Sequence, residues 1–352
     1  MNVLIVTHSQ DNECVDMVTR ALEARGARPF RFDTDRFPGE IDVRVRVEGS
    51  TRRIEIEREG RVLELGELTA AWHRRLAVGR GIPESLEPQV RSASVEESRR
   101  VVLGMLASLT CFVLDPWVRI RQAEVKELQL ELARALGLEI PRTLVTNDPA
   151  AVRSFFDECA GRVVTKMMAS FAIREDGRER VVFTTPISAA DLEALDGLRL
   201  CPMTFQERVD KERELRVTVV GTRVFAAAID SNALERARTD WRREGLALVD
   251  RWQPCALPAE VEARLLALMD ALGLNYGAAD FIVTPEGRHV FLELNPAGEF
   301  FWLERENGFP ISAALADVML GRAARREPPL LALDPRLEPG RTGPVAVCPP
   351  TS

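Results

Sequence analysis

Two acidic residues and an amide near the C-terminus have types and a spacing that could hold a divalent metal ion. Asp280 lies in the apolar segment "ADFIVT", and Glu293 and Asn295 lie in "HVFLELN". Side chains alternate between the two faces of a strand, so Glu293 and Asn295 would share one face. The turn sequence "TPEG" between the segments predicts a β-hairpin. A hairpin centred between Glu286 and Gly287 would place Asp280 opposite Glu293.

A cation would relieve the repulsion between these two facing carboxylates. Their oxygens, with the amide oxygen of Asn295, suit Mg²⁺ or Mn²⁺ better than zinc. Mg²⁺ that is held by few carboxylates usually completes its coordination with water and substrate phosphates. The spacing alone also fits a solvent-facing strand that carries acidic residues. The apolar neighbours Phe281 and Leu294 and the following Pro296 favour a magnesium site for a nucleotide.

Length and composition describe a globular chain of two or three domains. The 352 residues exceed one ordinary hydrophobic core. The formal net charge of −7 argues against general nucleic-acid binding. No apolar run reaches the roughly 18 residues of a membrane span, and the N-terminus lacks the basic start of a signal peptide. The six cysteines show no pairing motif, which favours free thiols in a reducing cytoplasm.

The order of expected elements indicates an α/β chain. "NVLIVT" predicts a strand, "NECVDMVTRALEARG" an amphipathic helix and "PFRFDTD" a second strand. This is a βαβ opening without the G-x-G-x-x-G fingerprint of dinucleotide binding. Alternating charged and branched residues over 41–65 predict an antiparallel hairpin pair. "CFVLDP" predicts a buried strand that ends at Pro116, and one long helix is expected over "RQAEVKELQLELARALG".

Several segments together resemble ATP-grasp ligases. "DFIVTPEGRHVFLELNPAGEFFWLE" resembles the metal-binding hairpin of these enzymes. It is most similar to the subgroup that cross-links ribosomally made peptides, the microviridin-type ligases or graspetide synthetases. "MNVLIVTHSQD" is similar to the pre-ATP-grasp domain of that subgroup, and "VLDPWVRIRQAEVKELQLELARALGLEIPRTLVTND" to its domain junction. "DWRR" also has a counterpart there. The likeness covers most of the chain, and its motifs are specific in combination.

The resemblance implies the ATP-grasp fold, in which two α+β subdomains grip ATP, preceded by an α/β pre-ATP-grasp domain. We therefore expect the pre-ATP-grasp domain over 1–116 and the central ATP-grasp subdomain over 117–201. The C-terminal subdomain with the metal site would span 202–325. A tail rich in proline and arginine would occupy 326–352.

The same resemblance implies a nucleotide site. Lys126 and Lys166 match two lysines that bind the phosphates, a role that suits a compact positive charge. The chain prefers arginine strongly and has one other lysine, which weakens the alternative that both are ordinary surface residues. Glu207 and the backbone of Val209 match the hinge that meets the adenine edge. Glu214 matches the acidic residue that binds the ribose hydroxyls.

Two arginines and the metal ligands complete the implied site. Arg216 lies on the same strand face as Glu214 and would reach the phosphates or the acyl intermediate. Ordinary cross-strand ion pairs are the plainer alternative for both residues. Arg242 would be a second arginine for phosphate or substrate, or else an exposed loop residue. The segment "KMMASFAIREDGRERVVF" has one glycine, so the phosphate lid stays unassigned. The residues that match the metal ligands are Asp280, Glu293 and Asn295.

The resemblance implies an ADP-forming carboxylate ligase. ATP would convert an Asp or Glu side chain of a precursor peptide to an acyl phosphate. Two Mg²⁺ ions, or Mn²⁺, and cationic side chains would offset the charge of the phosphoryl group. A Ser or Thr hydroxyl of the same peptide would then give an ω-ester cross-link, and a Lys amine an ω-amide. The enzyme needs no covalent intermediate of its own, so we propose no nucleophilic Ser or Cys.

The expected partner is a precursor peptide with a leader and an acidic core. The resemblance implies that the leader docks near the hairpin at 171–185, which would raise the effective concentration of the core. Basic runs at 72–80, 119–121 and 174–180 could receive the core, although a solvated face is the plainer explanation of any single arginine. The family also implies a homodimer. Nucleic acid and membrane are not expected partners.

Two other functions fit part of the pattern. A ligase of the glutamate-adding type would share the nucleotide and metal residues. The N-terminal segment and "NPAGEFFWLE" favour the peptide cross-linker over that ligase. A non-catalytic ATP-binding scaffold is the third interpretation, and the complete set of lysines and metal ligands argues against it.

Overall fold

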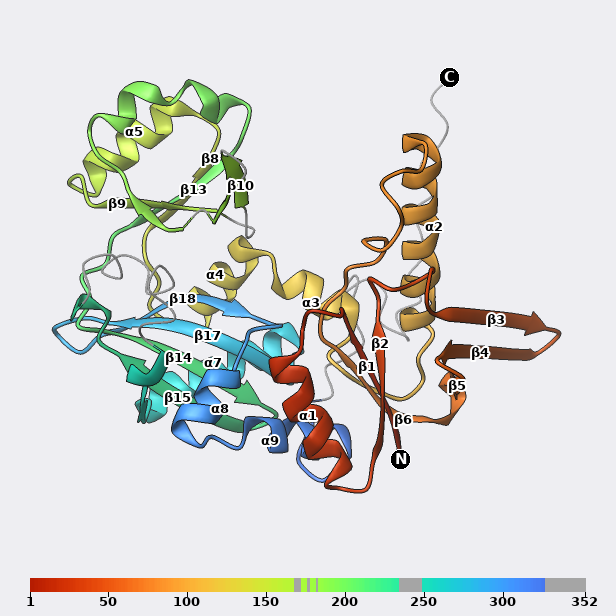
Figure 1. The fold of residues 1–352 in the computed structure, drawn as a ribbon. Coiled ribbons are helices and arrows are strands. Elements are labelled where there is room, and N and C mark those ends of the chain that lie inside the picture. The colour runs from red at the N-terminus through yellow and green to blue at the C-terminus, as the bar shows by residue number, and fades with distance from the viewer. Residues whose placement is uncertain (168–171, 176–177, 182, 234–248, 327–352) are drawn as a thin grey trace, which may run out of the picture.

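The structure is a computed structural model that describes residues 1–167, 172–175, 178–181, 183–233 and 249–326. In Figure 1 the N-terminal third (red to orange) lies beside the C-terminal third (green to blue), and the middle of the chain forms a separate lobe above the latter. The described elements are mixed α/β, as expected. In the described part of the chain, no helix combines the length and the apolar composition needed to cross a bilayer.

A four-stranded parallel sheet forms the centre of the N-terminal region. β1 (Asn2–Thr7) lies between β2 (Arg28–Asp33) and β6 (Leu68–His73), and β7 (Phe112–Leu114) completes the order β2-β1-β6-β7. α1 (Glu13–Glu23) connects β1 to β2, which confirms the expected βαβ opening. The buried residues of α1 recur at helical spacing, and they are Cys14, Val15, Val18 and Leu22.

A three-stranded antiparallel sheet extends from this region and confirms the pairing expected over 41–65. It contains β3 (Asp42–Glu48), β4 (Thr51–Arg58) and β5 (Arg61–Glu64). Ile54 and Ile56 alternate with charged residues and pack into the core of the parallel sheet, so one face is buried and the other is solvated. α2 (Pro88–Ala107) follows and buries Val102 and Met105 in the same core.

The single long helix expected over "RQAEVKELQLELARALG" is wrong, because the chain forms two helices. α3 (Trp117–Ala123) ends before α4 (Lys126–Ala135) begins, and Val125 between them is extended, with ψ of 104°. The side chain of Gln129 donates to the carbonyl of Ala123. That bond satisfies a carbonyl which a continuous helix would use for its own ladder. The break sets the first residue of α4 beside the C-terminal sheet.

The central lobe contains a four-stranded sheet in the order β12-β9-β13-β8. Its strands are β8 (Thr143–Thr146), β9 (Val163–Lys166), β12 (Thr185–Pro186) and β13 (Met203–Glu207). α5 (Pro149–Glu158) covers this sheet with Val152 and Phe155. A separate hairpin, β10 (Ala172–Glu175) and β11 (Arg178–Val181), lies between β9 and β12 in the chain.

A five-stranded antiparallel sheet in the order β16-β15-β14-β17-β18 forms the C-terminal region. Its strands are β14 (Arg213–Val220), β15 (Arg223–Ile229), β16 (Gln253–Cys255), β17 (Tyr276–Val283) and β18 (His289–Asn295). α4 and α7 (Ala259–Leu272) share a core with this sheet. α8 (Phe301–Asn307) and α9 (Ile311–Met319) share another core with the sheet and with α1 and β1.

The N-terminal and C-terminal regions are therefore joined by a common hydrophobic core. It includes Val18 of α1, Leu315 of α9 and Phe225 of β15. The domain limits expected at 116, 201 and 325 stay predictions. The common core contains residues from both sides of the first limit. The tail expected over 326–352 lies outside the described residues except for Arg326.

Candidate functional site

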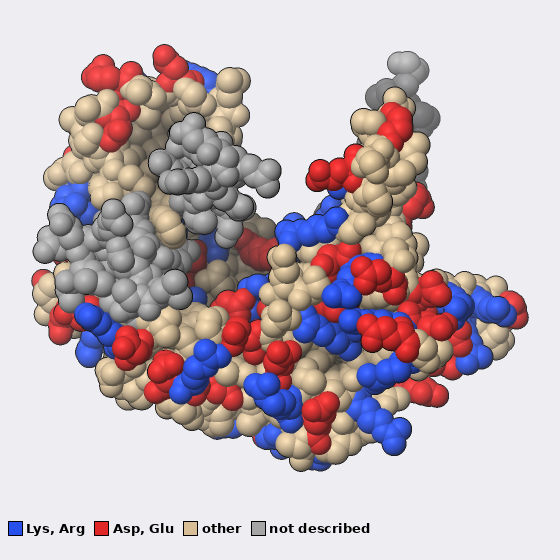
Figure 2. Space-filling view, viewed as in Figure 1, with Lys and Arg blue, Asp and Glu red and all other residues tan. Residues whose placement is uncertain are grey.

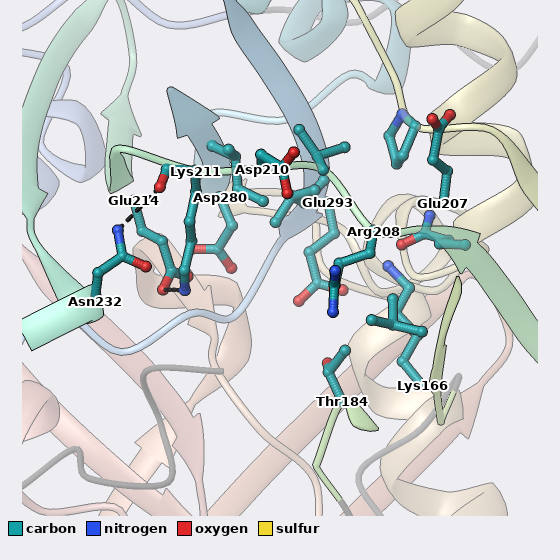
Figure 3. A pocket seen from close by; sticks show the side chains of 16 residues that line it. Lys166, Thr184, Glu207, Arg208, Asp210, Lys211, Glu214, Asn232, Asp280 and Glu293 are labelled. Carbon is teal, nitrogen blue, oxygen red and sulfur yellow. Dashed lines mark hydrogen bonds and ion pairs between the residues drawn. The ribbon is translucent and has the colours of Figure 1, made fainter. Parts of the chain in front are cut away.

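A cavity of about 340 Å³ lies between β13 of the central lobe and the C-terminal sheet. Figure 3 shows charged side chains of both signs projecting into it from the two lobes. Figure 2 shows that the molecule is also hollowed between the lobe of α5 and that of α2. The residues expected at the nucleotide site that line this cavity are Lys166, Glu207, Val209, Glu214, Asp280 and Glu293.

A β-bulge in the β17–β18 hairpin brings the two carboxylates to the same face. Near the turn the paired residues are symmetric about Glu286 itself, not about the bond that follows it. The register shifts between Asp280 and Phe281, and beyond the shift Asp280 pairs with Glu293 as expected. The additional residue is Leu292, which lines the cavity beside Glu293. Without the bulge, strand alternation would turn Glu293 into the core.

The amide of Asn295 bridges the two carboxylates. Its Nδ2 lies 3.2 Å from Asp280 Oδ2 and 3.3 Å from Glu293 Oε1. The expectation that Glu293 and Asn295 share a face is confirmed, whereas their role as metal ligands stays a prediction. Two carboxylates and an amide are donors that Mg²⁺ accepts, and the amide oxygen would face the metal after a half-turn of the amide.

This set would need further ligands from the substrate. In the ranges that the structure describes, no cluster of three His, Cys, Asp or Glu side chains could hold a metal ion. Mg²⁺ prefers an octahedral shell and keeps water or phosphate oxygens where the protein offers few ligands. The donor set therefore fits a metal that arrives with a phosphorylated ligand.

Two residues of α4 hold β18 in place. Lys126 Nζ lies 3.1 Å from Glu293 Oε2. Gln129 bonds both backbone groups of Leu294, because its Oε1 accepts from the amide at 2.8 Å and its Nε2 donates to the carbonyl at 2.8 Å. Gln129 thus acts as a strand partner at the outer edge of β18, between Glu293 and Asn295. Sequence reasoning missed Gln129, since the helical pattern does not distinguish it from an ordinary polar residue.

Arg216 faces the same hairpin from β14. It pairs with Asp280 across the strands, and its NH1 lies 3.0 Å from a carboxylate oxygen of that residue. Its guanidinium also lies 5.5 Å from the ring centre of Trp302. The side chain is 9% exposed, so most of it is removed from water. The cross-strand ion pair that was the plainer alternative for Arg216 therefore exists. Its acidic member is Asp280, a predicted metal ligand.

Glu214 lies farther along β14 in a polar cluster. Its carboxylate contacts Lys211 Nζ and accepts from Ser231 Oγ at 2.6 Å. Asn232 donates to the carbonyl of Lys211 at 2.9 Å and so fixes the loop before β14. Figure 3 shows Glu214, Lys211 and Asn232 together at one end of the cavity. Sequence reasoning did not assign Lys211 or Asn232, although Lys211 is the third lysine of the chain.

The segment expected to meet adenine follows β13. Glu207 ends this strand, and its carboxylate lies 3.4 Å from Arg162. The amide of Arg208 donates to the carbonyl of Arg162 at 2.8 Å, which ties the segment to the end of the central lobe. Glu207 and Val209 line the cavity, and Lys166 reaches it from the end of β9. Arg242 lies outside the described residues, so its predicted role stays open to experiment.

The basic runs expected to receive an acidic peptide differ in their exposure. In the run 72–80, Arg74 is buried with 1% of its side chain exposed, whereas Arg80 is exposed. In the run 119–121, Arg121 is exposed and pairs with Glu124 at 2.7 Å. The side chains of 174–180 lie outside the description.

Comparison with known proteins found one family and several similar structures. The profile of the MvdD pre-ATP grasp domain matches residues 2–121. The macrocyclase MdnC bound with precursor peptide MdnA, from Microcystis aeruginosa MRC, is 46% identical, with a TM-score of 0.83 over 91% of this chain and 100% of that one. A RiPP-associated ATP-grasp ligase of Chryseobacterium gregarium, in complex with ADP and a leader and core peptide, is 39% identical, with a TM-score of 0.89 over 94% and 99% of the two chains.

Two more distant proteins are also similar. The ATP-grasp ligase PsnB, complexed with a minimal precursor, Mg and ADP, is 26% identical, with a TM-score of 0.72 over 91% of this chain and 96% of that one. A probable alpha-L-glutamate ligase of Teredinibacter turnerae (strain ATCC 39867 / T7901) is 26% identical over 220 residues, which are 61% of this chain and 69% of that protein.

Proposed function

The chain belongs to the ATP-grasp ligases that mature ribosomally made peptides, the graspetide maturases, and on this premise we propose that it cross-links a precursor peptide through its own side chains. It is an ADP-forming ligase. The acid would be an Asp or Glu side chain of the peptide. The nucleophile would be a Ser or Thr hydroxyl, which gives an ω-ester, or a Lys amine, which gives an ω-amide.

The reaction we propose has two steps. The peptide carboxylate attacks the γ-phosphorus of ATP, so ADP leaves and an acyl phosphate forms. The hydroxyl or amine then attacks the acyl carbon, inorganic phosphate leaves and the nucleophile loses a proton. The sum is ATP hydrolysis coupled to removal of one water from the peptide. No enzyme nucleophile takes part.

The observation that carries the proposal is the pairing of Asp280 with Glu293 beside two cationic side chains. Asp280, Glu293 and Asn295 would hold two Mg²⁺ ions, or Mn²⁺, which supply positive charge to the transferring phosphoryl group. Lys126 and Arg216, which contact these carboxylates at 3.1 and 3.0 Å, would turn to the phosphates and the acyl phosphate.

The remaining predicted residues would hold and orient the nucleotide. Lys166 would contact phosphates from β9, and Glu214 would accept hydrogen bonds from the ribose hydroxyls. Glu207 and the backbone of Val209 would meet the adenine edge. Arg242 would supply a further positive charge to the substrate. Burial of the cavity between two lobes favours these contacts by excluding water.

The proposed partner is a precursor peptide with a leader and an acidic core. The MdnC structure contains the precursor peptide MdnA, and the Chryseobacterium gregarium structure contains a leader and core peptide, which supports a peptide partner. The leader would dock at the β10–β11 hairpin, and the core would enter the hollow between the lobes. We expect the enzyme to act as a homodimer in the cytoplasm, where ATP is available.

Similarity to a probable alpha-L-glutamate ligase supports a second candidate function, the addition of glutamate to a carboxylate. The two are separated by measuring ADP release under three conditions: with an acidic precursor peptide, with free glutamate, and without an acceptor. ADP release that requires the peptide supports the proposal. Release with glutamate but not with the peptide would replace it by the glutamate ligase, and nucleotide binding without release would indicate a scaffold.

A further inference from the structure

The chain turns sharply directly after the strand that carries Glu293 and Asn295. The amide of Gly298 donates to the carbonyl of Asn295 at 3.2 Å. A Cβ on Gly298 would lie 2.5 Å from the Cβ of Ala278, the strand partner of Asn295. Such an approach excludes any side chain, so glycine is required here. The turn therefore packs against the strand position that holds Asn295.

The N-terminal region grips this turn through Arg74, which directly follows β6. Its guanidinium donates to the carbonyl of Ala297 and, at 3.2 Å, to the carbonyl of Gly298. The side chain is 1% exposed. The buried carbonyl of Gly298 needs a partner, and it obtains one from a residue more than two hundred positions earlier in the chain.

Arg74 belongs to a network of two basic and two acidic side chains at this turn. Arg74 contacts Asp11 at 3.4 Å and Glu299 at 2.9 Å, and Arg75 contacts Glu299 at 2.6 Å. Burial raises the pKa of the Cys14 thiol to about 12, so the thiol stays protonated and donates to Glu299 at 2.9 Å. Removal of one buried partner would leave another charge uncompensated. The network therefore favours one position of the turn.

A second, uncharged donor holds the same carbonyl. Tyr276 begins β17, and its hydroxyl donates to the carbonyl of Gly298 at 2.6 Å. Burial raises the pKa of Tyr276, so this hydroxyl stays protonated. The carbonyl of Gly298 thus lies between a donor of the N-terminal region and a donor of the strand that carries Asp280.

We propose that Arg74 is a positioning residue of the metal site: by fixing the turn at 296–299 against β17, it holds Asn295 and Glu293 in the arrangement that binds Mg²⁺. The inference rests on the proposed function in one respect, the assignment of these residues as metal ligands. In this proposal the N-terminal region helps to position the metal ligands, and the segment "PAGE" after β18 forms the turn through which it does so.

A purely structural role for Arg74 predicts a different pattern of effects. Arg25 crosses the same boundary, and its guanidinium contacts Asp317 of α9 at 2.6 Å, but it does not contact the turn. Arg25→Lys therefore weakens the docking of the N-terminal region and serves as the matched control. Tyr276→Phe removes a donor from Gly298 without changing any charge, and it serves as the second test variant.

The test measures ADP binding by calorimetry over a series of Mg²⁺ concentrations, without peptide. For Arg74→Lys, which keeps the charge but loses the guanidinium fork, the Mg²⁺ concentration at half-maximal ADP binding should rise about tenfold, as for outer-shell partners of metal ligands. Tyr276→Phe should raise it in the same direction by less. ADP affinity at saturating Mg²⁺ should be kept, and Arg25→Lys should resemble the wild type in both measurements.

The proposal is overturned if the Mg²⁺ requirement of Arg74→Lys equals that of the wild type, or if all three variants raise it equally. If Arg74→Lys does not fold, Tyr276→Phe against Arg25→Lys decides alone. A wild-type enzyme that binds ADP with Mg²⁺ but modifies no peptide would refute the proposed function and leave this inference intact.

Discussion

The ammonium group of Lys126 lies 3.1 Å from a carboxylate oxygen of Glu293, and the guanidinium of Arg216 lies 3.0 Å from Asp280. Each of the two carboxylates proposed as metal ligands is thus paired with a basic residue that we propose to bind phosphate or acyl phosphate. These bases compete with a metal ion for the carboxylates, and phosphates would draw them away. Metal and nucleotide are therefore expected to bind together, because each replaces an ion pair that the protein makes with itself.

Lys126→Met tests this exchange. The substitution removes the ammonium that competes with a metal for Glu293, so Mn²⁺ affinity of the nucleotide-free protein should rise severalfold. ADP affinity should fall about tenfold, since a hydrogen bond to a charged group contributes about 1.5–3 kcal/mol. Titration with Mn²⁺ followed by electron paramagnetic resonance, and calorimetry with ADP, measure the two quantities.

Lys211→Met is the control for Lys126→Met, because Lys211 contacts Glu214 at the other end of the cavity. It should leave Mn²⁺ affinity unchanged. Equal Mn²⁺ affinities for Lys126→Met and the wild type would contradict the exchange of partners.

Gln129→Leu should lower the free energy of unfolding. It leaves the amide and carbonyl of Leu294 buried without their present partners, and each lost partner costs about 1–3 kcal/mol. We expect a loss of about 2–4 kcal/mol in urea denaturation, with a weaker response of ADP binding to Mg²⁺. Gln122→Leu, at an exposed position of α3, is the control. A loss no greater than that of the control would show that this edge contact contributes little.

Glu214→Gln should reduce recognition of the ribose. A carboxylate accepts a stronger hydrogen bond from a hydroxyl than an amide does. ADP affinity should fall about tenfold, which is about 1.4 kcal/mol, and 2′-deoxy-ADP affinity should fall by less. Glu212→Gln, at an exposed neighbouring position, should change neither affinity. If both nucleotides lose the same affinity in Glu214→Gln, the carboxylate does not contact the 2′-hydroxyl.

His73 should make the fold sensitive to acid. Burial lowers the pKa of His73 from 6.5 to about 4, so the folded protein disfavours the proton that the unfolded chain binds. The contribution of His73 to the free energy of unfolding is fully present above the unfolded pKa and is lost as pH falls toward the folded pKa. By about pH 5 the loss from this residue is about 2 kcal/mol.

His73→Phe measures that contribution, because phenylalanine keeps the stacking on Trp117, whose ring centre lies 5.2 Å away. Urea denaturation of the variant should change less between neutral and acidic pH than that of the wild type. The same change in both proteins would exclude His73 as the cause.

The hairpin that carries Asp280 and Glu293 could be predicted because its signals are local. A turn sequence and period-two alternation fix which residues of neighbouring strands face each other, and Asp280 does pair with Glu293. The bulge at Leu292 was not predictable, since alternation in "FLELN" fits a regular strand equally well. The expected pairing of Asp280 with Glu293 is correct, but it arises differently. The turn is centred on Glu286, and the bulge then shifts the register by one residue.

Most of the site contacts that could not be predicted from the sequence join segments that are distant in the chain. Gln129 and Leu294 are separated by 165 positions, and Arg74 and Gly298 by 224. No local pattern marks a polar residue whose partner is the backbone of another region. The break between α3 and α4 was missed for a related reason, because Gln129 bonds the carbonyl of Ala123 as well as the backbone of Leu294.

Mass spectrometry of the acidic peptide encoded beside this gene, after co-expression with wild-type enzyme or with Glu293→Gln, tests the central claim most directly. Glu293→Gln keeps the size of the side chain and removes the charge that we propose to hold the metal. We predict that the wild type removes the mass of one water for each cross-link, and that Glu293→Gln removes none. Loss of water with both proteins would contradict the metal site at the hairpin, and an unmodified peptide with the wild type would contradict the peptide cross-linking function.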